Sequence, residues 1–327
     1  MTAMSNFVPD LAVVLTVRNG SERFPHKAMA RVGGKALLAW IVQRVRQLGP
    51  TVIATTSEHE DDEIVDLAAA LDIACYRGPT DDVVSRVLEA VQSFFPSAQY
   101  VLRALGDQPF LDIPLVSYAV SKMAEHQADA FTWAMAPYCW PVYGAREFPY
   151  SIKALERINA HAEEREHLDS YFHEHRGEFR ILYHTPPPNL YLRPYRLEVD
   201  WLEDLNLVQG VAAGPGMLAP LPDILRWLDR HEDIARANRS RVEKTGPSTY
   251  PRKVQRKWLY EMKGKPILDW TGEVWEPPSP DAMPIYCAAG SCLLGFGDRG
   301  ALHRPDRTII KGNAFIQCSC GTGRVWV

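Results

Sequence analysis

The chain has 327 residues, of which 46% are hydrophobic and 23% are charged, and its formal net charge is −4. This composition is typical of a packed globular protein and excludes a chain that is disordered throughout. The net charge disfavours a chain-wide electrostatic grip on nucleic acid. No apolar run has the ~18 residues that a membrane-spanning helix needs, and the first fifteen residues hold no Lys or Arg. We therefore expect no membrane span, no secretory signal and a cytoplasmic location.

Charge and cysteine content divide the chain into two regions. Residues 239–265 hold nine basic and two acidic residues, a net charge of +7, so the remainder sums to −11. Four of the six cysteines lie in the last 41 residues. The segment TGPSTYP at 245–251 has neither a helix nor a strand pattern. These shifts predict one domain over residues 1–245 and a smaller one over 246–327.

The first 240 residues alternate between strand-like and helix-like runs. An apolar-alternating run over 195–199 also predicts a strand, which ends just before a helix. The βαβα order favours an open, mostly parallel α/β sheet with helices on both faces, whose ligands bind beyond the carboxyl ends of the strands. The other expected elements are strands at 11–17, 51–55, 73–76 and 100–105 and helices at 36–48, 61–71 and 81–95.

The loop after the first strand is rich in cations. Arg18, Arg23 and Lys27 surround Gly20 and Ser21 within ten residues. Glycine lets the backbone approach a ligand closely, neighbouring N–H groups can cradle phosphate oxygens, and the three cations can neutralise a triphosphate. The loop matches neither the Walker A pattern nor GxGxxG, and a solvated basic turn is the alternative interpretation.

Two carboxylates are expected at strand ends near this loop. Asp107 follows the strand at 100–105, and Asp200 follows the strand at 195–199. Asp107 alone could simply cap the following helix. Two carboxylates from separate strand ends that face a basic loop are, however, what a hydrated Mg²⁺ bound to phosphates would use. Taken together, the loop and the carboxylates favour phosphate chemistry.

An ordered series of motifs resembles sugar-acid cytidylyltransferases, in particular the spore-coat polysaccharide cytidylyltransferase family, with CMP-KDO and CMP-sialic acid synthetases as relatives. The resemblance covers about residues 10–240, and the ordered set is far more specific than any one motif. The motifs are, in chain order, Arg18-x-Gly-Ser-x-Arg-x-Pro-x-Lys27, Gly33-Gly-Lys-x-Leu-Leu38, Ala54-Thr-Thr56 with Asp61-Asp-x-Ile64, Arg77-Gly-x-x-Asp-Asp-Val-x-x-Arg86, Arg103-x-x-Gly-Asp-x-Pro109, Arg165-Glu-His167 and Val199-Asp-x-x-Glu-Asp-Leu205.

The resemblance implies a Rossmann-like sheet of the nucleotide-diphospho-sugar transferase type. It implies an enzyme that binds CTP and, with Mg²⁺, transfers CMP to a sugar acid and releases pyrophosphate, in glycan or polysaccharide biosynthesis. It also implies a homodimer. By motif match it assigns catalysis on the triphosphate to Arg18, Arg23 and Lys27, nucleotide binding to Gly20, Ser21, Thr55, Arg77, Asp81 and Asp82, acceptor binding to Arg103, Arg165, Glu166 and His167, and Mg²⁺ binding to Asp107 and Asp200.

The sequence departs from the family pattern, chiefly on the acceptor side. His26 replaces the glycine usual before the lysine, and Glu147 is out of register with the family's acidic residue. A non-standard sugar, another nucleotide or a sugar-phosphate acceptor on the same fold is therefore an open alternative. A second alternative is a catalytically silent relative that binds a glycan or a partner protein. The retained cations and carboxylates argue against the silent relative, because a dead site has no physical need for clustered like charges.

Residues 246–327 lie outside the resemblance. Four cysteines could form a small zinc site, but their spacing is not the paired CxxC of zinc ribbons, and unliganded thiols are the alternative. The basic segment 239–265 could contact RNA, an anionic glycan or the acidic remainder of the chain, and we expect the last of these. The candidate zinc ligands are Cys287, Cys292, Cys318 and Cys320.

Overall fold

A computed structural model describes residues 6–134, 142–185, 193, 195–240, 262–269, 271–286, 292–299, 301–304, 306, 308–311, 315–317 and 324–326. The chain forms two compact units. Unit 1 comprises residues 1–130, 143–180 and 195–239, and unit 2 comprises residues 131–142, 181–194 and 240–327. The expected boundary at 245/246 lies outside the described residues. The two earlier segments of unit 2 have no counterpart in the sequence analysis.

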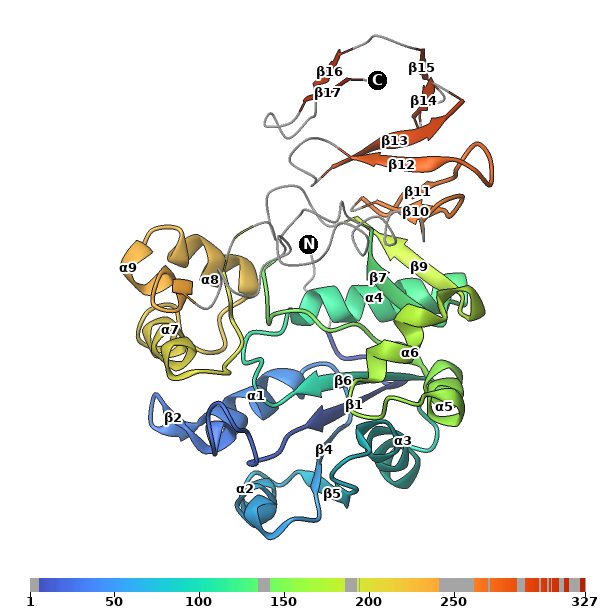
Figure 1. Cartoon of the computed structure of the whole chain (residues 1–327). Helices are drawn as coiled ribbons and strands as arrows, with labels where there is room; N and C mark the ends of the chain where they lie inside the picture. The colour runs from blue at the N-terminus through green and yellow to red at the C-terminus, as the bar shows by residue number, and fades with distance from the viewer. Residues whose placement is uncertain are drawn as a thin grey trace. The chain divides into compact units, whose positions relative to one another are not determined.

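Unit 1 is built on a sheet whose strands lie in the order β8-β6-β1-β4-β5 (Figure 1). The central strand β1 (Leu11–Thr16) pairs in parallel with β4 (Thr51–Thr56) and β6 (Tyr100–Leu105). β4 pairs in parallel with β5 (Ala74–Gly78), and the short β8 (Tyr150–Ser151) pairs antiparallel with β6. All six residues of β1 are buried, because a central parallel strand is covered on both faces. The four expected parallel strands are confirmed.

Three helices connect these strands: α1 (Leu37–Val45), α2 (Asp62–Ala70) and α3 (Val83–Phe94). The chain steps from β1 to β4 to β5 and then returns across the sheet to β6. Right-handed crossovers therefore place α1 and α2 on one face and α3 on the other (Figure 1). The expected α/β architecture with helices on both faces is confirmed.

The remaining elements of unit 1 surround this sheet. A short helix η1 and the hairpin β2–β3 follow the first loop, η2 precedes α2, and α5 packs against α3. Their bounds are η1 (Lys27–Met29), β2 (Arg31–Val32), β3 (Lys35–Ala36), η2 (His59–Asp61), α4 (Ile113–His126), α5 (Ile152–His161), α6 (Leu168–Glu174), η3 (Arg176–Glu178), α7 (Leu202–Ala213), α8 (Leu221–Leu228) and α9 (Glu232–Ala235).

The strand expected over 195–199 is wrong. Arg196 makes an isolated bridge with Tyr143, and the segment forms no ladder in the described structure. Leu197 and Val199 are buried as the alternation predicts, but the intervening Arg196 and Glu198 are buried too. The charged groups of Arg196 and Glu198 bond to other buried side chains instead of facing solvent. The alternation of apolar and charged residues therefore arises from a buried ionic network and not from a half-exposed strand. The helix that follows, α7, is confirmed.

Unit 2 contains strands from three separate segments of the chain. β7 (Ala130–Trp133) leads into it, β9 (Ile181–His184) pairs in parallel with β10 (Ile267–Leu268), and β10 pairs antiparallel with β11 (Val274–Trp275). A four-stranded antiparallel sheet comprises β12 (Met283–Tyr286), β13 (Leu293–Asp298), β14 (Ala301–His303) and β15 (Ile309–Lys311), and a two-stranded sheet comprises β16 (Phe315–Gln317) and β17 (Arg324–Trp326).

Two sequence expectations concern features that the described residues cover only in part. Cys292 is buried at the start of β13, whereas Cys287, Cys318 and Cys320 lie outside the described residues. Within the described part of the chain, no group of three or more His, Cys, Asp or Glu side chains is arranged to hold a metal ion. A search of the same residues finds no helix with the length and apolarity needed to cross a bilayer.

Candidate active site

The loops that follow β1 and β6 meet at the carboxyl edge of the sheet in unit 1. The N–H of Gly106, directly after β6, donates to the carbonyl of Thr16 at the end of β1. A Cβ on Gly106 would lie 2.6 Å from the Cβ of Val17, so only glycine permits this approach. The first residue of η1, Lys27, and the residue after Gly106, Asp107, are thereby brought together.

The Lys27 ammonium joins the two predicted metal-binding carboxylates. Its Nζ donates to Asp107 Oδ2 at 2.6 Å and to Asp200 Oδ1 at 2.8 Å. The three side chains are only 13%, 23% and 18% exposed. Burial alone would lower the pKa of Lys27, but the charges and hydrogen bonds of Asp107 and Asp200 outweigh it and raise this pKa. The same ammonium helps to lower the pKa of Asp200 against the effect of burial.

A buried arginine, Arg196, holds Asp200 from the other side. Its guanidinium contacts Glu198 Oε1 at 2.6 Å, Asp200 Oδ2 at 2.8 Å and Asp204 Oδ1 at 3.2 Å. Asp204 also accepts the N–H groups of Asp200 and Trp201, which fixes the start of α7. Burial and the charges of Asp107 and Asp200 raise the pKa of Glu198 in spite of Arg196.

The network brings basic side chains and carboxyl groups together in nearly equal numbers. Lys27, Arg23 and Arg196 face four carboxylates, and Arg23 Nη1 donates to Asp200 Oδ2 at 3.0 Å. The raised pKa of Glu198 favours its neutral form and so reduces the excess of negative charge. A largely buried ionic cluster needs charges that nearly balance, because an unpaired charge away from water is costly.

A buried carboxylate, Asp61, fixes the start of the cation-rich loop. Asp61 Oδ1 accepts the Asn19 N–H at 2.7 Å, and Oδ2 accepts the Thr55 hydroxyl at 2.9 Å and the Thr56 hydroxyl. The side chain of Asn19 donates to the Glu60 carbonyl at 2.8 Å. Thr55 is completely buried in these contacts, so it supports the loop that carries the predicted phosphate-binding residues.

Replacing Asp61 by asparagine is expected to lower the free energy of unfolding by about 2 kcal/mol. The reason is that an amide NH₂ group would then face N–H and O–H donors whose hydrogen bonds the carboxylate now accepts. Urea unfolding followed by circular dichroism measures this loss. Asp66→Asn, at an exposed position on α2, is the matched control and should change stability by less than about 0.5 kcal/mol. Equal effects of the two substitutions would contradict the role given to Asp61.

Arg165 and Asp82 form a clamp between the loop before α6 and the start of α3. Arg165 donates through Nε and Nη2 to the two oxygens of Asp82, both at 3.0 Å, and further to Asn159 and Ser85. Asp82 also caps α3 by accepting the Ser85 N–H. The guanidinium that the sequence assigned to the acceptor is thus engaged in joining two segments of unit 1.

The other predicted residues lie around this edge with partners of their own. Arg77 donates to Asp62 at 2.6 Å and to the Thr56 and Glu58 carbonyls. Arg18 pairs with Glu166 at 3.3 Å, and Arg103 donates to the Thr16 hydroxyl at 3.3 Å. Gly20, Asp81 and His167 are exposed and Ser21 is half-buried, while His26 is exposed next to Glu63.

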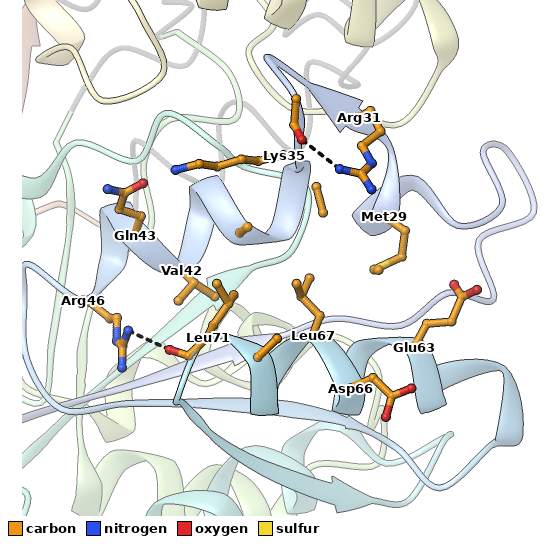
Figure 2. A pocket seen from close by; sticks show the side chains of 14 residues that line it. Met29, Arg31, Lys35, Val42, Gln43, Arg46, Glu63, Asp66, Leu67 and Leu71 are labelled. Carbon is orange, nitrogen blue, oxygen red and sulfur yellow. Dashed lines mark hydrogen bonds between the residues drawn. The ribbon is translucent and has the colours of Figure 1, made fainter.

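A separate groove of about 970 Å³ lies between α1 and α2 (Figure 2). Apolar side chains such as Val42 and Leu67 line its interior, while Arg46 and Asp66 stand at its edges. The Arg46 guanidinium donates to carbonyls at the end of α2, including that of Leu71. The groove's lining includes none of the predicted site residues, which lie at the carboxyl edge of the sheet instead.

Several residues of this site are not predicted by the sequence analysis. Asp204 lies inside a family motif, but the motif does not predict its contact with Arg196. The pattern Arg-Leu-Glu-Val-Asp over 196–200 contains a signal, since strands of a parallel sheet covered on both faces are usually apolar at nearly every position. Gln108, the residue after Asp107, forms a hydrogen bond of 2.8 Å with Glu147, and the sequence indicates only that Glu147 is out of register.

The parallel sheet, the cation-rich loop after its first strand and the carboxylates at its edge define a protein of the nucleotide-diphospho-sugar transferase type. A family model described as cytidylyltransferase matches residues 12–209. The chain therefore belongs to the cytidylyltransferase family, which supports nucleotidyltransferase activity and confirms the resemblance drawn from the motifs.

Individual relatives agree with this assignment. The chain is 25% identical over 238 residues to the spore coat polysaccharide biosynthesis protein SpsF of Bacillus subtilis, covering 69% of this chain and 97% of that one. It is 28% identical over 138 residues to a 3-deoxy-manno-octulosonate cytidylyltransferase of Marinomonas sp., covering 42% and 52%. A solved cytidylyltransferase structure from Leptospira borgpetersenii superposes with a TM-score of 0.63 at 21% identity, covering 70% of this chain and 97% of that chain, and shows the same fold.

Proposed function

We propose that this protein transfers CMP from CTP to a sugar acid and releases pyrophosphate, with Mg²⁺ held by Asp107 and Asp200. The observation that carries the proposal is the joining of these two carboxylates by Lys27, at distances of 2.6 and 2.8 Å. Family membership supports the nucleotide, and the relative named a 3-deoxy-manno-octulosonate cytidylyltransferase supports a sugar acid as acceptor.

The carboxylates fit a divalent cation. Asp107 Oδ1 is buried and has no hydrogen-bond partner among the described residues, so it is available as a ligand. Carboxylate oxygens are the donors that Mg²⁺ prefers. When bound, Mg²⁺ would supply electrostatic stabilisation of the charge that develops on the phosphates.

The cations of the loop would act on the leaving group. Lys27 stays protonated because Asp107 and Asp200 raise its pKa, so it can offset negative charge that builds on pyrophosphate. Arg23 is half-exposed beside Asp200 and Arg18 is exposed near Glu166, which leaves both able to contact phosphate oxygens. Transfer at the α-phosphorus needs placement and charge neutralisation more than covalent help.

Thermal unfolding with CTP, UTP, GTP or ATP in the presence of Mg²⁺ tests the proposal. A nucleotide at 100 times its dissociation constant should add about 2.7 kcal/mol of stability, and we expect CTP to give the largest shift. Stabilisation by another nucleotide would leave the fold assignment unchanged and indicate that the enzyme transfers a different nucleotide. The absence of any shift would contradict the proposal and favour a silent binding protein.

A further inference from the structure

A second group of cations lies at this edge of unit 1, apart from Lys27. Arg86 comes from α3, Arg103 from β6 and Arg18 from the loop after β1. Arg86 is only 3% exposed, yet the bond that it makes is to the Pro79 carbonyl at 3.0 Å, and its Nε has no partner among the described residues. Within the same described residues, neither Arg86 nor Arg103 forms an ion pair with a carboxylate.

Two members of the group, Arg86 and Arg103, carry positive charge that no carboxylate among the described residues neutralises by contact, whereas Arg18 pairs with Glu166. Burial lowers the pKa of Arg86, and the charges of Arg103 and Arg18 lower it further, while Asp61 and Asp82 act in the opposite direction. Both of these carboxylates are already engaged, Asp61 in the loop and Asp82 with Arg165. Buried arginines are normally paired, so an unpaired one beside a second guanidinium favours an anionic ligand.

An unsatisfied polar group follows Arg103 closely along the chain. Gln108 is 7% exposed, its Nε2 donates to Glu147 Oε1 at 2.8 Å, and its Oε1 is buried without a partner among the described residues. Burial and the charge of Asp169 raise the pKa of Glu147 to about 8, although Gln108, Arg103 and Arg146 act to lower it. Glu147 is therefore largely protonated at neutral pH and can donate a hydrogen bond, while Gln108 Oε1 can accept one.

We propose that Arg103, Gln108 and Glu147 form the acceptor subsite, in which Arg103 binds an anionic group and the Gln108–Glu147 pair binds hydroxyl groups. Arg86 is a positioning residue that adds positive charge near Arg103. The ligand is thus a polyhydroxylated compound with one anionic group, either a carboxylate or a phosphate. The inference rests on the proposed function and deepens it. It keeps Arg103, which the resemblance already assigns to the acceptor, adds Gln108 and Glu147, and removes Arg165, which is engaged with Asp82.

Pyrophosphate release at saturating CTP and Mg²⁺ tests this subsite with four kinds of acceptor. The probes are two sugar acids, 3-deoxy-manno-octulosonate and N-acetylneuraminate, one sugar phosphate, mannose 1-phosphate, and neutral mannose. We expect turnover with an anionic probe and none with mannose; the preferred probe distinguishes carboxylate from phosphate. Arg103→Gln should raise the acceptor KM about 30-fold and leave the KM for CTP within about twofold, because one charge-assisted contact is lost.

Glu147→Gln provides the second readout. In the wild type, acceptor kcat/KM should fall as pH rises through about 8, because ionised Glu147 can no longer donate. Glu147→Gln should remove this fall. Matched controls are Arg226→Gln on α8 and Glu125→Gln on α4, both at exposed side chains whose ion-pair partners in the described structure lie on the same helix. Arg103→Lys keeps the positive charge and should raise the acceptor KM less than Arg103→Gln does. It serves as the test variant if Arg103→Gln does not fold.

The outcomes distinguish failure of the proposed subsite from failure of the proposed function. Absence of CTP stabilisation in the wild type would overturn the proposed function itself. Stabilisation by CTP with transfer to an anionic probe, but with unchanged acceptor KM in Arg103→Gln and an unchanged pH profile in Glu147→Gln, would overturn the subsite alone. Stabilisation by CTP with no transfer to any anionic probe, or with equal transfer to mannose, would also overturn the subsite.

Discussion

Asparagine at position 107 is expected to lower the rate of CMP transfer by about 1,000-fold while the protein stays folded. Asp107→Asn preserves the shape of the side chain but removes the charge that would hold Mg²⁺ and that Lys27 now neutralises at 2.6 Å. A thousandfold loss corresponds to about 4 kcal/mol of transition-state stabilisation, within the range that a catalytic metal contributes. The fold should tolerate the change, because Lys27 keeps its contact with Asp200.

Single-turnover pyrophosphate release at saturating CTP and Mg²⁺ measures this effect, and urea unfolding checks that the variant is folded. Asp223→Asn on the exposed side of α8 is the control, since its partner is the neighbouring Arg226. A rate for Asp107→Asn within threefold of the wild type would show that the metal-binding assignment is wrong.

The second large effect concerns stability. Arg196→Met should lower the free energy of unfolding by about 4 kcal/mol, because removing one partner of a buried ionic network leaves the others uncompensated. Arg196 is 2% exposed and faces Glu198, Asp200 and Asp204. Methionine matches the length of the stem and keeps most of its packing, so the loss reports on charge rather than on a cavity.

The loss should depend on pH in a defined direction. The cations hold the pKa of Asp200 below its ordinary value in the wild type, so this carboxylate contributes stability above that value and loses it as pH falls. Without Arg196 the carboxylates lose this support, and protonation at low pH relieves their repulsion. Urea unfolding should therefore show a larger difference between wild type and Arg196→Met at pH 8 than at pH 4. Arg226→Met serves as control, and a loss as small as the control's would contradict the network.

The sequence predicts the sheet of unit 1 well because local patterns determine it. The run at 11–17 is apolar at nearly every position, which only a strand covered on both faces requires, and the observed β1 spans Leu11–Thr16. The helices at 36–48, 61–71 and 81–95 carry apolar stripes at helical spacing, and the structure shortens each by a few residues at its ends.

The candidate site is less predictable because its contacts join distant residues. Lys27 is separated by 80 residues from Asp107 and by 173 from Asp200. Motif order indicates that they converge, but it does not show that Lys27 bonds to both carboxylates. Arg165 shows a second limit of motif matching. A family motif includes this residue but does not distinguish a ligand contact from the structural bond to Asp82 that the structure shows.

The interleaved composition of unit 2 has a consequence for truncation of the chain. The chain passes between the units five times, and the core of unit 2 gathers Ala134 and Tyr183 from the two internal segments with Met262, Tyr286 and Phe296 from the C-terminal one. A chain that ended after residue 239 would therefore expose apolar side chains of both internal segments to water. Such a truncated chain is expected to aggregate more readily than the full chain, so the C-terminal region is part of what keeps the internal segments covered.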